Sequence, residues 1–246
     1  MVSKELSGNE EYVRRFNLYR IIEHLVLIML FVILATTGLA QKFHALSVSR
    51  SIFIGLGGID SIRQIHHIAG VFFAVLTIQH ILVVFIGIIF SKWQPSMLIT
   101  FKDSRDALHN VRYYMGLLDS PAMCGRYTYK EKFVYWLILL GGIQMIFTGL
   151  FLWFPVAMTK YISGQIIPVS KIIHTNNAML IFLLIAVWHI YDNVLNPEVF
   201  PLNKSIFTGY IKKSRMELEH PLELKELMGD GDEEEPEPHP DHEMSK

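Results

Sequence analysis

The sequence is poor in cysteine, and this excludes several kinds of redox centre. Cys124 is the one cysteine among 246 residues, and it stands in a polar stretch. A disulfide needs two cysteines, an iron–sulfur cluster needs several thiolates, and covalent haem attachment needs a C-x-x-C-H motif. None of these can form within this chain, so any haem would be held non-covalently, as b-type haem.

Charged residues are scarce over four long stretches of a chain that is 51% hydrophobic, with a mean hydropathy of +0.33. The stretches cover residues 21–40, 65–90, 133–158 and 172–195, and each is near the roughly 20 residues that cross a bilayer as one helix. The polar N-terminus shows no cleavable signal pattern, so we expect the first stretch to be retained. The composition predicts an all-α integral membrane protein, a four-helix bundle.

The domain organisation follows from the same pattern. We expect an N-terminal segment over 1–20, the four-helix domain over 21–227 and a tail over 228–246. The tail is acidic and contains prolines, which is typical of disordered segments. We expect its His239 and His242 to be solvated rather than bound to a metal.

Basic residues predict how the helices are oriented. They concentrate before the first helix, in residues 91–132 and after Tyr210, and they are scarce in residues 41–62. Because cytoplasmic loops are enriched in Lys and Arg, we expect both termini and the long loop to be cytoplasmic in a bacterial inner membrane. Residues 103–118 of this loop predict a short amphipathic helix, which either lies at the membrane surface or is a plain linker helix.

Histidines form two layers in the predicted helices. His174 and His189 are fifteen residues apart on one helix, which gives about 22 Å of rise, and they point within about 60° of each other. His66 and His80 differ in direction by about 40°, whereas His67 and His80 lie on largely opposite faces. The predicted orientation places His66, His67 and His174 near the outer face and His24, His80 and His189 near the cytoplasmic face.

Two layers of imidazoles predict a functional site, because ionisable residues inside membrane spans are rare and costly. Imidazole is a common axial ligand of haem iron, and two stacked haems would need four of these histidines. The simplest assignment pairs His66 with His174 for an outer haem and His24 with His189 for an inner haem.

Other polar residues near these layers have open or secondary roles. His80 could replace His24 as a ligand, hydrogen-bond a propionate or line a pocket. Arg63 is a candidate partner for the propionates of the outer haem. Gln144 and Thr148 lie inside the third helix, and we expect them to help pack the helices rather than to bind iron.

The ligand positions resemble those of the di-haem cytochrome b subunits of membrane-bound formate dehydrogenases (the gamma subunit) and NiFe hydrogenases. In that family the first helix carries one ligand, the second carries one in an R-x-x-H-x-x-x-G context, and the fourth carries two. The matching positions are His24, His66 between Arg63 and Gly70, His174 and His189. The resemblance covers residues 14 to about 227 and implies two b haems. The stretches HNVRYYMGL, GRYTYKEKFVYW, WHIY and EHPLEL are similar to a branch encoded with periplasmic multihaem c-type cytochromes.

The chain departs from this family at one quinone contact. The formate dehydrogenase branch has Y-N-x-G-Q-K at the cytoplasmic start of the third helix, and its Asn helps to bind quinone. Residues 127–132 of this chain read YTYKEK. The Asn and the Gly are absent, so the resemblance does not imply that contact here.

The sequence therefore predicts a subunit of a quinone/quinol oxidoreductase complex, which passes electrons between the quinone pool and a periplasmic redox partner. The expected partner is a multihaem cytochrome c or an iron–sulfur subunit, the expected quinone is menaquinone, and no nucleic acid is expected. Two alternatives stay open: a membrane anchor whose haems are structural or absent, and a transmembrane reductase that acts without quinone.

Polar residues near the inner layer predict where the quinone binds. The candidates are Glu23, His80, His109, Tyr127 and Asp192. Asp192 lies three residues after His189, and residues three apart on a helix are neighbours. The alternative is that Glu23 and Asp192 are interfacial charges, which pair with Arg20 or Lys130.

Overall fold

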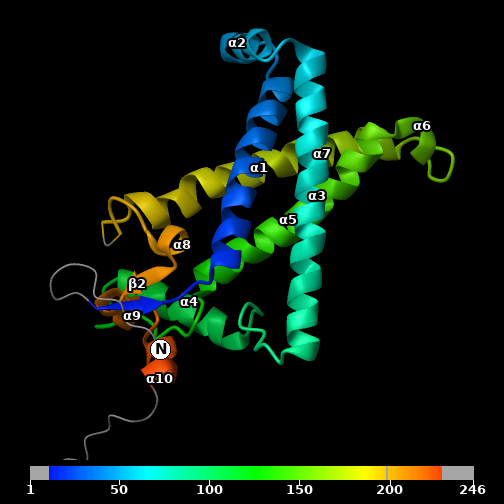
Figure 1. The fold of residues 1–246 in the computed structure, drawn as a ribbon. Helices are drawn as coiled ribbons and strands as arrows, with labels where there is room; N and C mark the ends of the chain where they lie inside the picture. The colour runs from blue at the N-terminus through cyan, green and yellow to red at the C-terminus, as the bar shows by residue number, and fades with distance from the viewer. Residues whose placement is uncertain (1–10, 198, 229–246) are drawn as a thin grey trace, which may run out of the picture.

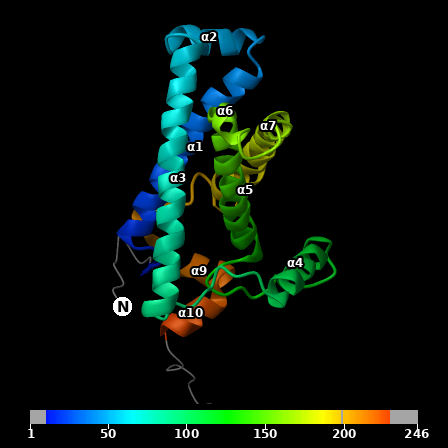
Figure 2. The ribbon, with the colours of Figure 1, turned by 90° about the vertical axis from the view of Figure 1, so that its right-hand side faces the viewer.

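Four long helices organise the fold, and each is long and apolar enough to cross a membrane. The computed structural model describes residues 11–197 and 199–228 (Figures 1 and 2). The spans are α1 (Leu18–Lys42), α3 (Ile59–Phe90), α5 (Tyr129–Trp153) and a last helix, Ile166–Leu195, which contains α7 (Ile166–Leu184) and two π-helical segments. The four predicted spans are confirmed, whereas the acidic tail, with His239 and His242, lies outside the described residues.

The spans form two helix pairs. α1 packs along α3, and α5 packs along α7, while contacts of α3 with α5 and of α1 with α7 join the pairs. Figure 1 shows the α5–α7 pair crossing the α1–α3 pair obliquely. Gly142 of α5 lies where the pairs meet, and a Cβ there would come within 2.8 Å of the Phe73 ring. A small residue at this position lets the two helices approach closely.

Local sequence signals fix several helix ends. Asn17 caps α1 by accepting a backbone N–H of the first turn at 3.0 Å, and Thr128 and Glu131 form a capping box at the start of α5. α5 ends at Trp153, because Pro155 has no N–H with which to continue the helix. α5 therefore begins before the apolar stretch 133–158 and ends within it.

The last span leaves α geometry around His189. Its backbone forms π turns over Ile185–His189 and Tyr191–Leu195, in which N–H groups bond to carbonyls five residues back. The N–H of Asn196, for example, donates to the carbonyl of Tyr191 at 2.9 Å. The wider turns change the direction of the side chains, so the angle of about 60° expected between His174 and His189 for a regular α-helix does not apply.

Short helices occupy the connections and the C-terminal part of the described chain. α2 (Ser47–Gly55) lies in the stretch 41–62, which was predicted as a loop, and α4 (Phe101–Tyr114) is the amphipathic helix predicted within 103–118. The others are α6 (Pro155–Met158), α8 (Ser205–Thr208), α9 (Lys213–Glu219) and α10 (Pro221–Met228).

The fold is mostly helical as predicted, and the described residues add one small antiparallel sheet that the sequence did not predict. β1 (Tyr12–Arg14) pairs with β2 (Tyr210–Lys212), and Val13 lies opposite Ile211. Val13 and Ile211 pack with Met216 and Leu224 in a buried apolar cluster. We call β1, β2, α9 and α10 the terminal clasp. β1 therefore joins residues 12–14, near the start of the first span, to the C-terminal part of the described chain.

A buried arginine joins the terminal clasp to the start of α5. Arg15 donates from Nη2 to the carbonyl of Arg126 at 2.9 Å and to Glu131 at 3.2 Å, and its Nε lies 3.8 Å from Glu223. Burial raises the pKa of Glu223, and this effect outweighs the lowering by Arg15 and Arg126. Because removing one partner of a buried ion pair is strongly destabilising, the clasp and the bundle stabilise each other.

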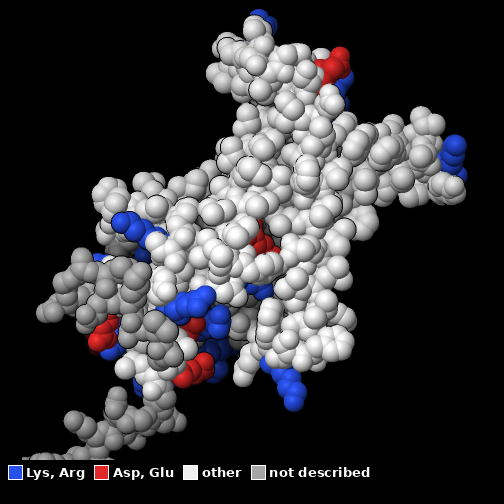
Figure 3. All heavy atoms as spheres, viewed as in Figure 1, with Lys and Arg blue, Asp and Glu red and all other residues white. Residues whose placement is uncertain are grey.

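Charged side chains avoid the middle of the molecule. On the face shown in Figure 3, most of them gather around α4 and α9 at one end and around α2 and α6 at the other, and one small red and blue patch lies between. A bilayer core requires a largely uncharged band on a lipid-facing surface. The exposed apolar side chains of the spans therefore face lipid.

A second buried ion pair fixes α4 to α5. Lys132 Nζ lies 2.8 Å from one carboxylate oxygen of Asp103 and 2.9 Å from the other, and the two side chains are 11% and 10% exposed. Burial tends to raise the pKa of Asp103, but hydrogen bonds from Lys132 and Thr100 outweigh it and lower the pKa below its usual value. The pair holds the long loop against the bundle.

We expect Lys132→Met to lower the free energy of unfolding by about 3–5 kcal/mol, because it leaves the Asp103 carboxylate buried without its partner. Thermal unfolding in detergent measures this loss. Lys102→Met breaks the more exposed pair with Asp106 and should cost less than about 1 kcal/mol. Equal losses in the two variants would contradict the prediction.

The same pair predicts a pH dependence. A carboxylate whose pKa falls on folding contributes stability above its unfolded pKa, and that stability is lost as the pH falls through the lower folded value. The stability difference between wild type and Asp103→Asn should therefore be full at neutral pH and should shrink only below about pH 3.8, the ordinary pKa of an aspartate in an unfolded chain. Unfolding midpoints measured over a pH series test this, and a difference that already shrinks near pH 6 would contradict it.

Candidate functional site

Two pairs of histidine rings lie inside the bundle. His66 of α3 faces His174 of α7, and His24 of α1 faces His189 in the first π turn. In both pairs the ring centroids are 6.3 Å apart, with interplanar angles of 70° and 53° respectively. We call them the outer pair and the inner pair, after the predicted orientation. The structure thus brings together the four rings in the two pairings expected from the sequence.

Threonine hydroxyls orient the outer pair. Thr37 Oγ1 donates to the backbone carbonyl four residues earlier at 2.7 Å and lies 2.8 Å from His66 Nδ1. Thr148 Oγ1 does the same at 2.8 Å and lies 2.9 Å from His174 Nδ1. A hydroxyl has one proton, so each threonine that gives it to the backbone accepts the imidazole N–H. Nδ1 then carries the ring proton, and Nε2 keeps the lone pair that binds a metal.

A glycine follows each of these threonines and leaves room for the ring. A Cβ at Gly38 would lie 3.4 Å from Cε1 of His66, and a Cβ at Gly149 would lie 3.4 Å from Cε1 of His174. A larger side chain at either position would push the ring away. The sequence Thr-Gly-Leu occurs at 37–39 and again at 148–150, so both helix pairs hold their outer histidine in the same way.

The likeness of the two helix pairs extends to the inner layer. His24 and Tyr135 each lie thirteen residues before the orienting threonine of their own helix. His24 faces His189, whereas Tyr135 faces His80, with its hydroxyl 3.1 Å from Nε2 and the ring centroids 5.7 Å apart. Tyr135 therefore occupies in the second helix pair the place that His24 has in the first. This accounts for the partner of His80, which is a tyrosine rather than an imidazole.

The inner pair lacks such hydroxyl partners. His24 Nδ1 is buried, and no hydrogen-bond partner for it lies among the described residues. His189 Nδ1 lies 3.5 Å from Nδ2 of Asn193, which also donates to the His189 carbonyl at 2.9 Å. The inner rings are therefore positioned by packing and by the π-helical backbone more than by side-chain hydrogen bonds.

The spacing of the rings fits one metal between the members of each pair. A metal–imidazole bond is about 2 Å long and a ring nitrogen lies roughly 1.1 Å from the centroid, so two imidazoles on opposite sides of one iron have centroids roughly 6 Å apart. The observed 6.3 Å agrees with this value. Within residues 11–197 and 199–228, no three or more His, Cys, Asp or Glu side chains are placed so that they could hold a bare metal ion. Two imidazoles alone suffice where a macrocycle supplies the other ligands of the metal, and the two histidine pairs therefore fit b-type haem.

Glu23 and His80, two of the predicted quinone contacts, lie together. His80 Nδ1 is 2.9 Å from Glu23, whose other carboxylate oxygen accepts from Arg20 at 2.7 Å. The Tyr19 hydroxyl donates to Glu23 at 3.3 Å and accepts from the amide of Gln79. Glu23 therefore forms the ion pair with Arg20 that was the alternative to a quinone contact, and it also belongs to a larger hydrogen-bonded group. We call this group the inner polar cluster: Tyr19, Arg20, Glu23, Gln79, His80 and Tyr135.

Two further predicted quinone contacts have partners elsewhere. Asp192 accepts from Trp188 Nε1 at 2.8 Å and lies 3.9 Å from Lys130 Nζ, which is the ion pair given as its alternative. His109 Nε2 lies 3.0 Å from the carbonyl of Ser120, in the loop after α4. These contacts bind the two side chains to their own surroundings rather than to the inner polar cluster.

Tyr127 and Arg63 also lie apart from that cluster. The Tyr127 ring is 6.0 Å from the guanidinium carbon of Arg15 and 5.8 Å from that of Arg126, beside the terminal clasp. Arg63 is largely exposed at the start of α3 and lies 3.5 Å from Asp60. Of the five predicted quinone contacts, the structure therefore brings Glu23 and His80 together.

The sequence did not predict several residues that lie at these sites. They are Tyr19, Thr37, Gln79 and Tyr135, and Thr148 was expected only to pack the helices. The repeated Thr-Gly-Leu could have revealed both threonines, because it precedes a histidine-bearing helix each time. No comparable pattern marks Gln79, whose contact with Tyr19 depends on how α1 and α3 pair. His67 stacks on Trp153 at 4.4 Å, on another face of α3 from its neighbour His66.

Comparison with known proteins gives one family. A family model described as "Prokaryotic cytochrome b561" matches residues 15–209, which include all four spans and both histidine pairs. The search of curated proteins found no match. The match ends at residue 209, directly before β2.

Proposed function

The chain belongs to the prokaryotic cytochrome b561 family, and from this premise we propose that it passes electrons across the bacterial inner membrane between the quinone pool and a periplasmic redox partner. Membership of the family makes it a membrane cytochrome b that binds b-type haem and takes part in electron transport. The proposal adds two stacked haems, their ligands and the two redox partners.

The observation that carries the proposal is the two imidazole pairs, each of which takes one ring from the last span. His66 and His174 would hold an outer haem, and His24 and His189 would hold an inner one. Bound b-type haem supplies one-electron exchange between ferric and ferrous iron. The two rings of the last span are separated by about 22 Å of helix, so the sites form a ladder across the bilayer.

The chain's own residues would set the properties of each site. Thr37 and Thr148 fix the outer rings with Nε2 free, and second-shell hydrogen bonds of this kind raise the basicity of a ligand. Near the inner ligands, Glu23 and Arg20 add a carboxylate and a guanidinium, whose charges act at short range in an apolar span. The apolar walls of the spans limit the access of water to both sites.

A quinone partner is consistent with the electron and proton balance. Oxidation of one quinol yields two electrons, which two one-electron sites can accept in turn, and two protons, which leave where the quinol binds. The resemblance to the formate dehydrogenase and hydrogenase subunits supports a periplasmic partner at the outer face, such as a multihaem cytochrome c or an iron–sulfur subunit. The chain would then be one subunit of a quinone/quinol oxidoreductase complex.

Quinol-dependent haem reduction tests the proposal. Purified protein in proteoliposomes should show a reduced-minus-oxidised b-type band, and menaquinol should produce it. A protein without this band would favour a membrane anchor. A band that another donor produces but menaquinol does not would favour a reductase that acts without quinone.

We expect Thr37→Val to weaken retention of the outer haem by about 10- to 100-fold, because His66 loses the hydrogen bond that fixes its tautomer. Transfer of haem to apomyoglobin measures retention. Thr37→Ser keeps the hydroxyl and should behave like the wild type. Equal losses in the valine and serine variants would show that the hydroxyl has no such role.

The proposed orientation is tested by cysteine labelling in spheroplasts. Cys124 is buried, and its burial raises the pKa of the thiol, so the test uses a Cys124→Ser background. A membrane-impermeant maleimide should label Ser47→Cys in intact spheroplasts and should label Ser104→Cys only after lysis, since both positions are exposed. The reverse pattern would invert the assignment of outer and inner layers.

A further inference from the structure

We propose that the quinone binds between α1 and α3, with its isoprenoid tail in an apolar groove and its head group against Gln79 and Tyr19. This inference rests on the proposed quinone function and deepens it. Two independent features carry it: a long groove open to the lipid, and the inner polar cluster at the groove's end.

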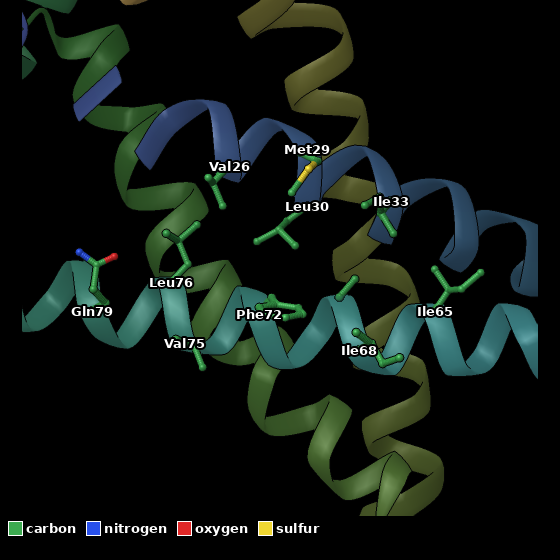
Figure 4. Close-up of a pocket in the computed structure, with 11 residues that line it drawn as sticks. Val26, Met29, Leu30, Ile33, Ile65, Ile68, Phe72, Val75, Leu76 and Gln79 are labelled. Atoms are coloured by element: carbon green, nitrogen blue, oxygen red, sulfur yellow. The ribbon is translucent and has the colours of Figure 1, made fainter. Parts of the chain in front are cut away.

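The groove runs along α1 and α3 and has a volume of about 510 Å³. Figure 4 shows it on the near side of these two helices, with α5 and α7 behind. From Ile65 to Gln79 the α3 wall rises by fourteen residue steps, which correspond to about 21 Å of helix. The groove is therefore long enough for several isoprene units of an extended tail.

The lining is apolar except at one end. It consists of Val26, Met29, Leu30, Ile33, Ile65, Ile68, Ala69, Phe72, Val75, Leu76 and Gln79. Phe72 is 61% exposed although it lies in the middle of the span, so the groove opens toward the lipid. A hydrocarbon tail can enter such a groove sideways from the bilayer.

Gln79 is the polar end of the groove and the link to the inner polar cluster. Its amide donates to the Tyr19 hydroxyl, which donates to Glu23. Glu23 is also 2.9 Å from His80 Nδ1, and the opposite nitrogen of that ring is 3.1 Å from the Tyr135 hydroxyl. A ligand that follows the groove toward the cytoplasmic layer therefore meets a continuous hydrogen-bonded chain.

The chemistry of this end matches a quinone head group. Quinone carbonyls accept hydrogen bonds, and the Gln79 amide has two N–H donors, of which Tyr19 accepts only one. Glu23 accepts, as a quinol hydroxyl requires, and it is adjacent in sequence to the inner ligand His24. A pocket with apolar walls and a few convergent polar groups is the usual form of a small-molecule site. A lipid acyl chain would fit the walls, but it would not use the polar end.

Blocking the groove tests the proposal with the complete, haem-loaded protein in proteoliposomes. Leu76 reaches into the groove opposite Val26 (Figure 4), and Leu76→Trp should obstruct the tail. Two reductants separate the tail from the head: menaquinol carries an isoprenoid tail, and menadiol has the same ring without one. We expect the apparent affinity for menaquinol to fall by about tenfold or more, because a few buried CH₂ groups are worth that much. The response to menadiol should stay near the wild-type value.

Ile78→Trp is the matched control. Ile78 lies two residues further along the same helix, is 56% exposed and is not part of the groove lining. This variant should use menaquinol and menadiol as the wild type does. Gln79→Ala should weaken both reductants, because both carry the head group, and pyridine haemochrome content should be unchanged in all three variants.

A second measurement does not depend on haem. A menaquinone with a diazirine in its tail should crosslink to the α3 peptide that contains residues 65–79, as located by mass spectrometry. Leu76→Trp should suppress this crosslink, and Ile78→Trp should not.

The outcomes separate this inference from the proposed function. If neither quinol reduces the wild-type haems, the proposed quinone function is wrong. If both quinols reduce them and Leu76→Trp leaves the menaquinol response unchanged, the quinone binds elsewhere. Equal losses in Leu76→Trp and Ile78→Trp, or a crosslink confined to α5 or α7, would also overturn the site between α1 and α3.

Discussion

Replacing His174 by alanine should remove the outer haem and leave the inner haem in place. His174 and His66 would share one iron, so the substitution leaves that iron with a single protein ligand and leaves the Thr148 hydroxyl without its imidazole partner. The inner pair shares the last span with His174 but none of its rings. A pyridine haemochrome assay should therefore fall from two haems per chain to one.

His67→Ala is the control for this result. His67 is the sequence neighbour of His66 and stacks on Trp153, so it lies in the outer layer without belonging to a histidine pair. The control should keep both haems. Two haems per chain in His174→Ala would remove His174 from the ligand set, and loss of both haems would show that the two sites depend on each other.

Replacing His189 by alanine should disconnect the outer haem from the quinol. In the proposed arrangement the quinol delivers electrons beside the inner pair, and the outer pair lies about 22 Å further along the last span. Electron tunnelling slows exponentially with distance, so without the inner haem the electron has no step of suitable length. The rate of menaquinol-dependent reduction of the remaining haem should fall by orders of magnitude.

Dithionite distinguishes a disconnected haem from a lost one. Because it can reach the outer site directly, it should still reduce the remaining haem in His189→Ala. A wild-type rate with menaquinol in this variant would mean that the quinol delivers its electrons at the outer pair. Loss of the dithionite band would mean that the outer site does not survive the substitution.

The sequence was a sound guide to the membrane spans, because each is long, apolar and bounded by polar residues. It was less reliable at their ends. The apolar run 133–158 continues past Pro155, for example, although α5 ends at Trp153. The π turns around His189 have no signature in composition or period, since they depend on packing against the neighbouring helices.

The sequence could not predict the β1–β2 sheet, for a different reason. β1 and β2 are three residues each, too short for an alternating pattern to show, and they pair across almost the whole chain. Periodicity within one element cannot reveal such a pairing, which depends on how the bundle brings residues 12–14 and 210–212 to the same place.

The candidate site was predicted best where one helix carries two of its members. The positions of His174 and His189 on one span predicted two layers, and the structure brings each ring to the expected histidine. The quinone contacts were predicted from their expected depth in the membrane alone, and depth does not tell which helices a side chain faces. Depth grouped Glu23 with Asp192, but Glu23 lies against α3 and Asp192 pairs with Lys130 of α5.

The last span also decides when the protein can acquire its cofactors. Both histidine pairs take one ring from this span, so neither pair exists while the ribosome is still adding residues before His174. β2 follows the same span, and β1 therefore waits for its partner through the synthesis of nearly the entire chain. In the proposed arrangement haem would be loaded after translation of the last span, and a product that ends before residue 174 would lack one ring of each pair.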